Sequence, residues 1–158
     1  MVKIDLAQAY FHIRNFMSET IAEFHRNLLR LVYKGTLYQM TCLPFGLSPA
    51  PHIFATITSW IAEILRSRGV RIIVYLDDFL LASQNRANLS LQTAEALYIL
   101  RHLGWFIRND KCILQPCQEI EYLGLVWNTL TGQIHLPLNK IRSIQEILKK
   151  VETNALVL

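Results

Sequence analysis

Two adjacent aspartates, Asp77 and Asp78, stand between two short runs of β-forming residues in this 158-residue chain. The run before them is Val70–Val74, and the run after them is Phe79–Ala82. Two apolar runs on either side of a polar pair predict a β-hairpin with the carboxylates at its tip. A divalent cation normally offsets the repulsion of two such charges, because carboxylate oxygens are hard ligands suited to Mg²⁺ or Mn²⁺. By itself the dipeptide more often marks a solvated turn, since Asp tolerates turn geometry.

A third carboxylate, Asp5, lies in another β-like run, Val2–Leu6. Two-metal phosphoryl transfer requires carboxylates from separate strands that hold two cations about 3.5–4 Å apart. An aspartate near the end of one strand that faces an aspartate pair at a hairpin tip would meet this requirement. Asp5 alone would be an ordinary strand-end or helix N-cap residue. The prediction of a metal site therefore depends on all three aspartates together.

Several segments resemble the palm motifs of reverse transcriptases, in the family's order and at roughly its separations. Motifs A, B and C are matched by Asp5 with Tyr10 five residues later, by Leu43–Gly46 before a helix, and by Tyr75–Asp78. Motif D is matched by Leu103–Cys112, and the primer grip by Glu121–Gly124. The resemblance extends from about Val2 to Lys150, and five ordered motifs are hard to obtain by chance.

Within that family, the chain is most similar to retrotransposon enzymes. Phe45 stands in motif B where the retroviral enzymes have Gln. The later segments Leu123-Gly124, Ile134–Pro137 and Lys140-Ile141 are most similar to DIRS-type elements, with Gypsy-type elements as neighbours. The resemblance thus implies the palm domain of a retrotransposon RNA-directed DNA polymerase.

The resemblance also implies a role for each matching residue. Asp5, Asp77 and Asp78 would bind Mg²⁺, or Mn²⁺ in its place, and would transfer a nucleotide to a primer 3′-OH. Lys111 would be the acid that protonates the pyrophosphate leaving group, and Tyr10 would exclude the 2′-OH of ribonucleotides. The other substrate-binding residues would be Gln8, Ala9, Phe45 and Gly46, and the primer grip would be Tyr122, Leu123 and Gly124. The implied partners are an RNA or DNA template with its primer, and deoxynucleoside triphosphates.

Without the resemblance, several of these residues have commoner explanations. Tyr10 would be a core tyrosine, and Lys111 would be a solvated loop lysine. Gly46 before a helix is also simply a turn residue. Tyr122–Gly124 would be a strand with a bend.

Composition and charge fit a single domain with a polyanionic partner. A chain of 158 residues that is 52% hydrophobic can bury one core. The net charge of +4 favours nucleic acid, although a generic basic globular protein has the same charge. No uninterrupted apolar run reaches the ~18 residues of a membrane helix, and the N-terminus enters a strand with no room for a signal peptide. We therefore expect an intracellular protein, in the cytoplasm or nucleus, with Cys42, Cys112 and Cys117 as buried reduced thiols.

The alternation of strands and helices predicts an α+β fold, in which an antiparallel sheet packs against helices on one face. Apolar periodicity predicts helices over Ser48–Arg68, over Ala87–Leu103 and from about Asn139. Besides the aspartate hairpin, strands are expected at Met1–Leu6, Leu28–Lys34, Thr36–Thr41, Trp105–Ile107, Lys111–Leu114, Ile120–Trp127 and Gln133–Leu136. The palm-like domain is expected to cover residues 1–150, before a C-terminal tail at 151–158, and Arg14–Thr20 reads as an insertion relative to the family.

Three hypotheses about function remain open at this point. The first is a reverse transcriptase palm whose fingers, thumb and RNase H regions, absent from these 158 residues, would normally belong to the same polyprotein. The second is a truncated, catalytically inactive relic that at most binds nucleic acid. The third is an unrelated α+β interaction module with an acidic hairpin.

Overall fold

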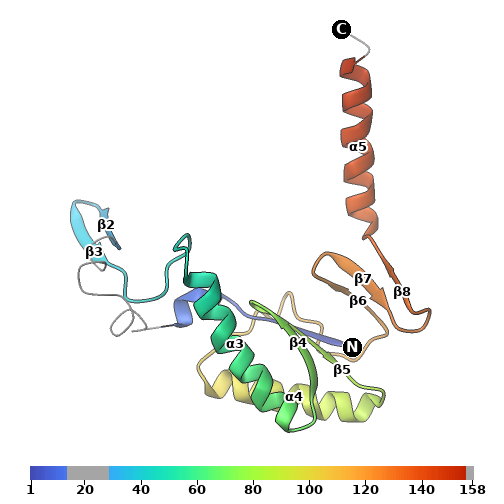
Figure 1. Ribbon diagram of the computed structural model, residues 1–158, viewed down its shortest axis with the longest axis horizontal. Helices are drawn as coiled ribbons and strands as arrows, with labels where there is room; N and C mark the ends of the chain where they lie inside the picture. The colour runs from blue at the N-terminus through green and yellow to red at the C-terminus, as the bar shows by residue number, and fades with distance from the viewer. Residues whose placement is uncertain (14–28, 156–158) are drawn as a thin grey trace.

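A three-stranded antiparallel sheet forms the centre of the fold, with its strands in the order β1-β5-β4 (Figure 1). The computed structural model describes residues 1–13 and 29–155, so the predicted insertion at Arg14–Thr20 lies outside the described residues. The three strands are β1 (Val2–Asp5), β4 (Arg71–Tyr75) and β5 (Asp78–Ala82). The strands β4 and β5 form the hairpin predicted around the aspartate pair, and β1 lies on the far side of β5.

Helices α3 (Ala50–Ser67) and α4 (Arg86–His102) build the main core against one face of this sheet (Figure 1). Alternate residues of a strand point to opposite faces. The residues of this core from the strands are Val2, Ile4, Ile72, Phe79 and Leu81, and those from the helices include Phe54, Ile61, Leu65, Leu89 and Leu100. The predicted α+β class, with helices on one face of the antiparallel sheet, is confirmed.

Local signals in the sequence explain where these helices begin and end. Pro51 lies in the first turn of α3, and Gly69 follows its last turn with a φ of 82°. The Asn85 side chain accepts a hydrogen bond from the Asn88 N–H at 3.0 Å and caps α4. No helix within the described ranges combines the length and the apolar character that crossing a membrane requires.

A second three-stranded sheet covers part of the other face of the central sheet. It consists of β6 (Glu119–Tyr122), β7 (Leu125–Asn128) and β8 (Gln133–His135), in that order. Leu80 of β5 packs there against Ile120 and Tyr122 in a smaller apolar cluster. Helix α5 (Leu138–Ala155) follows and projects away from both sheets (Figure 1). The expected domain end at residue 150 lies inside this helix.

The prediction of a single strand over Ile120–Trp127 is wrong. The chain reverses at Leu123 and Gly124, which have φ values of 52° and 75°, and β6 pairs with β7 across this turn. A leucine with positive φ carries no turn signal in the sequence, because hairpin turns of this kind ordinarily use Gly, Asn or Asp.

The two short strands predicted at Trp105–Ile107 and Lys111–Leu114 are also wrong. Each segment makes one isolated bridge with the chain around β1, between Leu6 and Ile107 and between Lys3 and Ile113. A turn separates the bridges, because the N–H groups of Lys111 and Cys112 both donate to the Arg108 carbonyl. The segment therefore runs antiparallel alongside β1, from Ala7 back to Met1, and the turn at residues 108–112 interrupts the pairing that a regular strand would need.

A separate hairpin and a short 3₁₀ turn complete the described chain. The hairpin is formed by β2 (Arg30–Tyr33) and β3 (Thr36–Gln39), as the sequence predicts, and it makes a two-stranded sheet of its own. The turn η1 (Ala9–His12) follows β1. The cysteines are free, as predicted, but each is half-buried.

Candidate active site

The register of the central sheet brings the three aspartates together. Asp5, the last residue of β1, is paired directly with Asp78, the first residue of β5. Directly opposite residues of an antiparallel pair project from the same face of a sheet. Asp77 lies in the adjoining turn, and its carbonyl accepts a hydrogen bond from the Leu6 N–H at 3.1 Å. Asp5 and the aspartate pair are therefore neighbours, as the sequence predicts.

The turn that carries Asp77 is conformationally strained. Leu76 has a φ of 53°, a left-handed conformation that side chains other than glycine rarely adopt. Such a conformation costs on the order of 1–3 kcal/mol and persists where the surrounding structure enforces it. Here the pairing of Tyr75 with Asp78 on one side, and of Asp78 with Asp5 on the other, enforces it.

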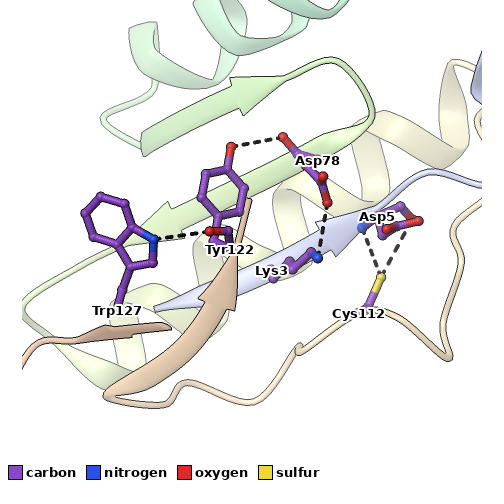
Figure 2. Close-up of polar contacts among 6 residues, drawn as sticks. All are labelled: Lys3, Asp5, Asp78, Cys112, Tyr122 and Trp127. Carbon is purple, nitrogen blue, oxygen red and sulfur yellow. Dashed lines mark hydrogen bonds and ion pairs between the residues drawn. The ribbon is translucent and has the colours of Figure 1, made fainter. Parts of the chain in front are cut away.

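Burial and like charge make the aspartate cluster electrostatically unfavourable by itself. Asp5 is only 7% exposed. Burial raises the pKa of Asp5, the charges of Asp78 and Asp77 raise it further, and Lys3 and Lys111 oppose the shift. Within the described part of the chain, Asp5 Oδ1 and Asp78 Oδ1 are buried oxygens that accept no hydrogen bond. Asp78 Oδ1 does lie 3.2 Å from Lys3 Nζ, so this contact is an ion pair without hydrogen-bond geometry (Figure 2).

The donor atoms of this cluster fit a hard divalent cation. Among residues 1–13 and 29–155, no three His, Cys, Asp or Glu side chains are already gathered closely enough to enclose a metal ion. However, oxygen ligands with negative charge are those that Mg²⁺ and Mn²⁺ prefer. Asp5 Oδ1 and Asp78 Oδ1 are buried oxygens without hydrogen bonds, and either can be a ligand of such a cation, Asp78 Oδ1 in exchange for its ion pair with Lys3. The residues present therefore fit the metal that the family resemblance implies.

Cys112 supports the backbone of Asp5 from the segment after α4. The Asp5 N–H donates to Cys112 Sγ at 3.2 Å, and the thiol lies 3.7 Å from the Asp5 carbonyl, to which it donates (Figure 2). Burial raises the pKa of Cys112, so the neutral thiol is favoured. The adjacent Lys111 is exposed, and its charge acts on Asp5. The sequence predicts Cys112 as a buried thiol at the end of the motif D segment, and its position next to Lys111 is the local signal for its contact with Asp5.

Tyr10 and Phe45 form an aromatic surface beside the aspartates. The Tyr10 ring centroid lies 4.8 Å from that of Phe45 and 4.7 Å from that of Phe54, on which it stacks. Burial raises the pKa of Tyr10, and the charges of Asp77 and Tyr75 raise it further. Phe45 remains 62% exposed, and Gly46 follows it with a φ of 83°. The structure therefore places the two predicted pocket aromatics in contact with each other and within electrostatic range of Asp77.

Gln8 and Ala9 connect the aspartates to this aromatic surface. Gln8 is exposed and has a φ of 51°, and it caps the N-terminal end of η1. Ala9 is buried in the main core. Both lie between Asp5 and Tyr10 in the chain.

The three residues of the predicted primer grip have different surroundings: Tyr122 is buried, whereas Leu123 and Gly124 line a cavity. Tyr122 is 2% exposed, and its hydroxyl donates to the Asp78 carbonyl at 3.3 Å (Figure 2). Burial, and then the charge of Asp78, raise the pKa of Tyr122 to about 12. In contrast, Leu123 and Gly124 line a cavity of about 310 Å³, together with Lys3, Asp78, Lys111, Ile113 and Glu121. The buried Tyr122 side chain therefore holds the backbone of Asp78, and the turn residues Leu123 and Gly124 line the cavity.

Comparison with known proteins identifies the family. A family model described as reverse transcriptase (RNA-dependent DNA polymerase) matches residues 1–127. The chain belongs to the reverse transcriptase family. This confirms the resemblance carried by the five motifs, and it excludes the hypothesis of an unrelated interaction module.

Viral proteins are among the relatives of this reverse transcriptase domain. Protein P of duck hepatitis B virus (strain China) is 26% identical over 157 residues, which cover 98% of this chain and 19% of that protein. The Gag-Pol polyprotein of walleye dermal sarcoma virus is 31% identical over 140 residues, which cover 87% of this chain and 8% of the polyprotein. The chain thus spans about a fifth, or less, of the length of these relatives.

A solved structure shares the fold of this domain. The foamy viral protease-reverse transcriptase in complex with an RNA/DNA hybrid has a TM-score of 0.75 at 19% identity, over 91% of this chain and 18% of that one. The same viral protein in complex with double-stranded DNA has a TM-score of 0.75 at 21% identity, over 91% of this chain and 28% of that one. These similarities confirm the reverse transcriptase fold.

Proposed function

We propose that this domain catalyses RNA-directed DNA synthesis, by metal-assisted nucleotidyl transfer to a primer 3′-OH, with Asp5, Asp77 and Asp78 as the metal ligands. The observation that carries the proposal is the register of Asp5 with Asp78, which leaves two buried carboxylate oxygens without hydrogen bonds. Hydrophobic residues would stabilise this end of the sheet better than one buried and two half-buried carboxylates of like charge. A function that needs those charges explains why they are there.

The metal ions supply the chemistry that the side chains lack. When bound, two Mg²⁺ or Mn²⁺ ions activate the attacking hydroxyl and neutralise charge on the transferred phosphate and its leaving group. The protein positions the ligands. The paired strands fix Asp5 against Asp78, and Cys112 and Arg108 hydrogen-bond the backbone of Asp5 from its other side. Positioning of this kind, together with electrostatic stabilisation, accounts for most of the catalysis in phosphoryl transfer.

The residues around the aspartates have complementary roles in this proposal. Tyr10, held between Phe45 and Phe54, presents a ring that would clash with a 2′-OH. Gly46 allows close approach of the substrate to the backbone, and Gln8 and Ala9 offer N–H groups to the triphosphate. Lys111 lies on the cavity next to Asp78, where it can protonate the leaving pyrophosphate. Leu123 and Gly124, on the same cavity, would hold the end of the primer.

The proposed partners are a primed nucleic-acid template and deoxynucleoside triphosphates. The foamy viral relative of this fold has been solved with an RNA/DNA hybrid and with double-stranded DNA. The net charge of +4 is compatible with such a polyanion. We further propose a retrotransposon origin, on the basis of Phe45 in motif B.

Primer extension tests this proposal directly. The assay uses the longest natural polypeptide that contains these residues, a primed RNA template, Mg²⁺ and deoxynucleotides. Asp77→Asn should reduce extension by on the order of 10²-fold or more, because a metal ligand that stabilises transition-state charge is lost. Glu63→Gln, which removes one negative charge from the exposed surface of α3, should leave extension unchanged. Extension that survives Asp77→Asn would contradict the proposal, and no extension by the wild type would favour the inactive relic.

A further inference from the structure

Lys3 lies on the same face of the sheet as the proposed metal ligands. It precedes Asp5 by two residues on β1, so both side chains project from one face. Its Nζ lies 3.2 Å from Asp78 Oδ1, and the two side chains are only 18% and 25% exposed (Figure 2). An ion pair this shielded from water is weakly screened by salt. In the absence of metal, the lysine is therefore the counter-ion of Asp78.

This ion pair occupies an oxygen that a divalent cation would need. A cation bound to the Asp78 carboxylate would lie about 2.1 Å from its ligand oxygen. The ammonium group at 3.2 Å from Asp78 Oδ1 would then stand directly beside a second positive charge. Repulsion between like charges at such a separation is strong where solvent is largely excluded. The ammonium group and the cation therefore compete for Asp78.

A second acidic residue, Glu121, lines the cavity next to Lys3. Glu121 on β6 lines the same cavity of about 310 Å³ as Lys3 and Asp78. Neither of the two ion pairs found in the described ranges includes Glu121. The flexible four-carbon stem of a lysine lets its ammonium group change partners without movement of the backbone.

We propose that Lys3 is a positioning residue that exchanges partners when metal binds, with its ammonium group moving from Asp78 to Glu121. This inference rests on the proposed metal site. In the metal-free protein, Lys3 neutralises Asp78 and keeps the carboxylate facing Asp5. When a divalent cation binds, Glu121 receives the displaced ammonium group. The apparent affinity of the site for metal therefore includes the free energy of this exchange.

A double-mutant cycle on Mn²⁺ affinity tests the exchange, with binding measured on the 158-residue chain by electron paramagnetic resonance. Lys3→Met should tighten Mn²⁺ binding by about tenfold, because the cation no longer displaces an ammonium group. Glu121→Gln should weaken binding by about threefold in the wild-type background, because the displaced lysine loses its second partner. In the Lys3→Met background the same change should have less than half of this effect.

Matched controls separate the exchange from a general change in charge. Lys150→Met removes a positive charge from α5. Glu119→Gln removes a negative charge two residues from Glu121 on the same strand. Both variants should bind Mn²⁺ with an affinity within about twofold of the wild type. Binding that is unchanged or weaker in Lys3→Met, or an equal effect of Glu121→Gln in both backgrounds, would overturn the exchange. Failure of the wild type to bind Mn²⁺, or of Asp77→Asn to weaken binding, would instead overturn the proposed metal site.

A measurement on the wild-type protein avoids any loss of folding in the variants. Amine-reactive labelling, read by mass spectrometry with and without Mg²⁺, compares Lys3 with the exposed Lys150 in the same sample. The labelling rate of Lys3 should change on addition of Mg²⁺, since its ammonium group moves to a new environment, and the rate of Lys150 should not. Equal labelling of Lys3 in both conditions at saturating Mg²⁺ would also overturn the exchange.

Discussion

Asp5 combines burial with two neighbouring negative charges, and these effects raise its pKa. The consequence for stability follows from proton linkage. Between the ordinary pKa and the raised one, the folded chain holds a proton that the unfolded chain has released. Asp5 therefore makes the metal-free fold less stable as the pH rises through this window, and the full penalty applies above the raised pKa. The function we propose requires a residue that the fold alone would not favour.

Neutralising Asp5 should therefore stabilise the metal-free protein. In EDTA at pH 7, Asp5→Asn should raise the free energy of unfolding by about 1–3 kcal/mol, because a buried charge without a hydrogen bond is removed. Urea unfolding followed by circular dichroism gives this value. Saturating Mg²⁺ should stabilise the wild type more than the variant. A variant less stable than the wild type in EDTA would show that the Asp5 carboxylate contributes to the fold.

Tyr10 should set the choice between deoxyribonucleotides and ribonucleotides. In the full-length natural protein, Tyr10→Ala should reduce discrimination against ribonucleotides by about tenfold or more, because the ring that clashes with the 2′-OH is lost. Tyr10→Phe keeps the ring and should retain the discrimination. Steady-state incorporation of each nucleotide class gives the ratio. Equal discrimination in Tyr10→Ala and the wild type would leave Tyr10 as a packing residue only.

At the scale of elements, the sequence predicts those helices and strands that a local pattern of apolar and polar residues defines. Apolar periodicity located α3 and α4, and the polar pair between two apolar runs located the β4–β5 hairpin. The reversal at Leu123 was missed, because its left-handed backbone is imposed by the pairing of β6 with β7. The sequence predicts two strands after α4, but the hydrogen bonds of this segment go to the Arg108 carbonyl and to the chain around β1. Pairing between segments that are distant in the sequence cannot be predicted from the local pattern of apolar and polar residues.

The β6–β7 turn should depend on glycine for two separable reasons. Gly124 has a φ of 75°, and a Cβ on it would overlap the Lys140 side chain, whose Nζ donates to the Gly124 carbonyl at 3.2 Å. Gly132 has a similar φ of 69° but open space around it. Gly132→Ala should therefore cost only the backbone strain of about 1 kcal/mol. Gly124→Ala should cost more, since the Lys140 hydrogen bond is lost as well.

Thermal or urea unfolding of four variants checks this expectation. The extra cost of Gly124→Ala over Gly132→Ala should disappear when both are made in a Lys140→Ala background. If the extra cost persists there, the turn depends on something other than the contact with Lys140.

At the scale of the whole molecule, the sequence predicted the candidate site better than the contacts around it. The order of the motifs located Asp5, Asp77, Asp78, Tyr10 and Phe45, which the fold brings into one region. The ion pair of Lys3 with Asp78 and the support of Asp5 by Cys112 depend on register and on packing between distant segments. Tyr122 matched a primer-grip position, but its burial against Leu80 follows from how the second sheet docks.

The proposed function requires that Asp5, Asp77 and Asp78 together bind catalytic metal. Anomalous scattering from crystals grown in Mn²⁺ tests this claim most directly. We predict anomalous peaks at the carboxylates of these three residues, with the Lys3 ammonium group away from Asp78, and loss of the peaks in Asp77→Asn crystals. Well-ordered carboxylates with no peak beside them at saturating Mn²⁺, or peaks only at other sites, would contradict the account.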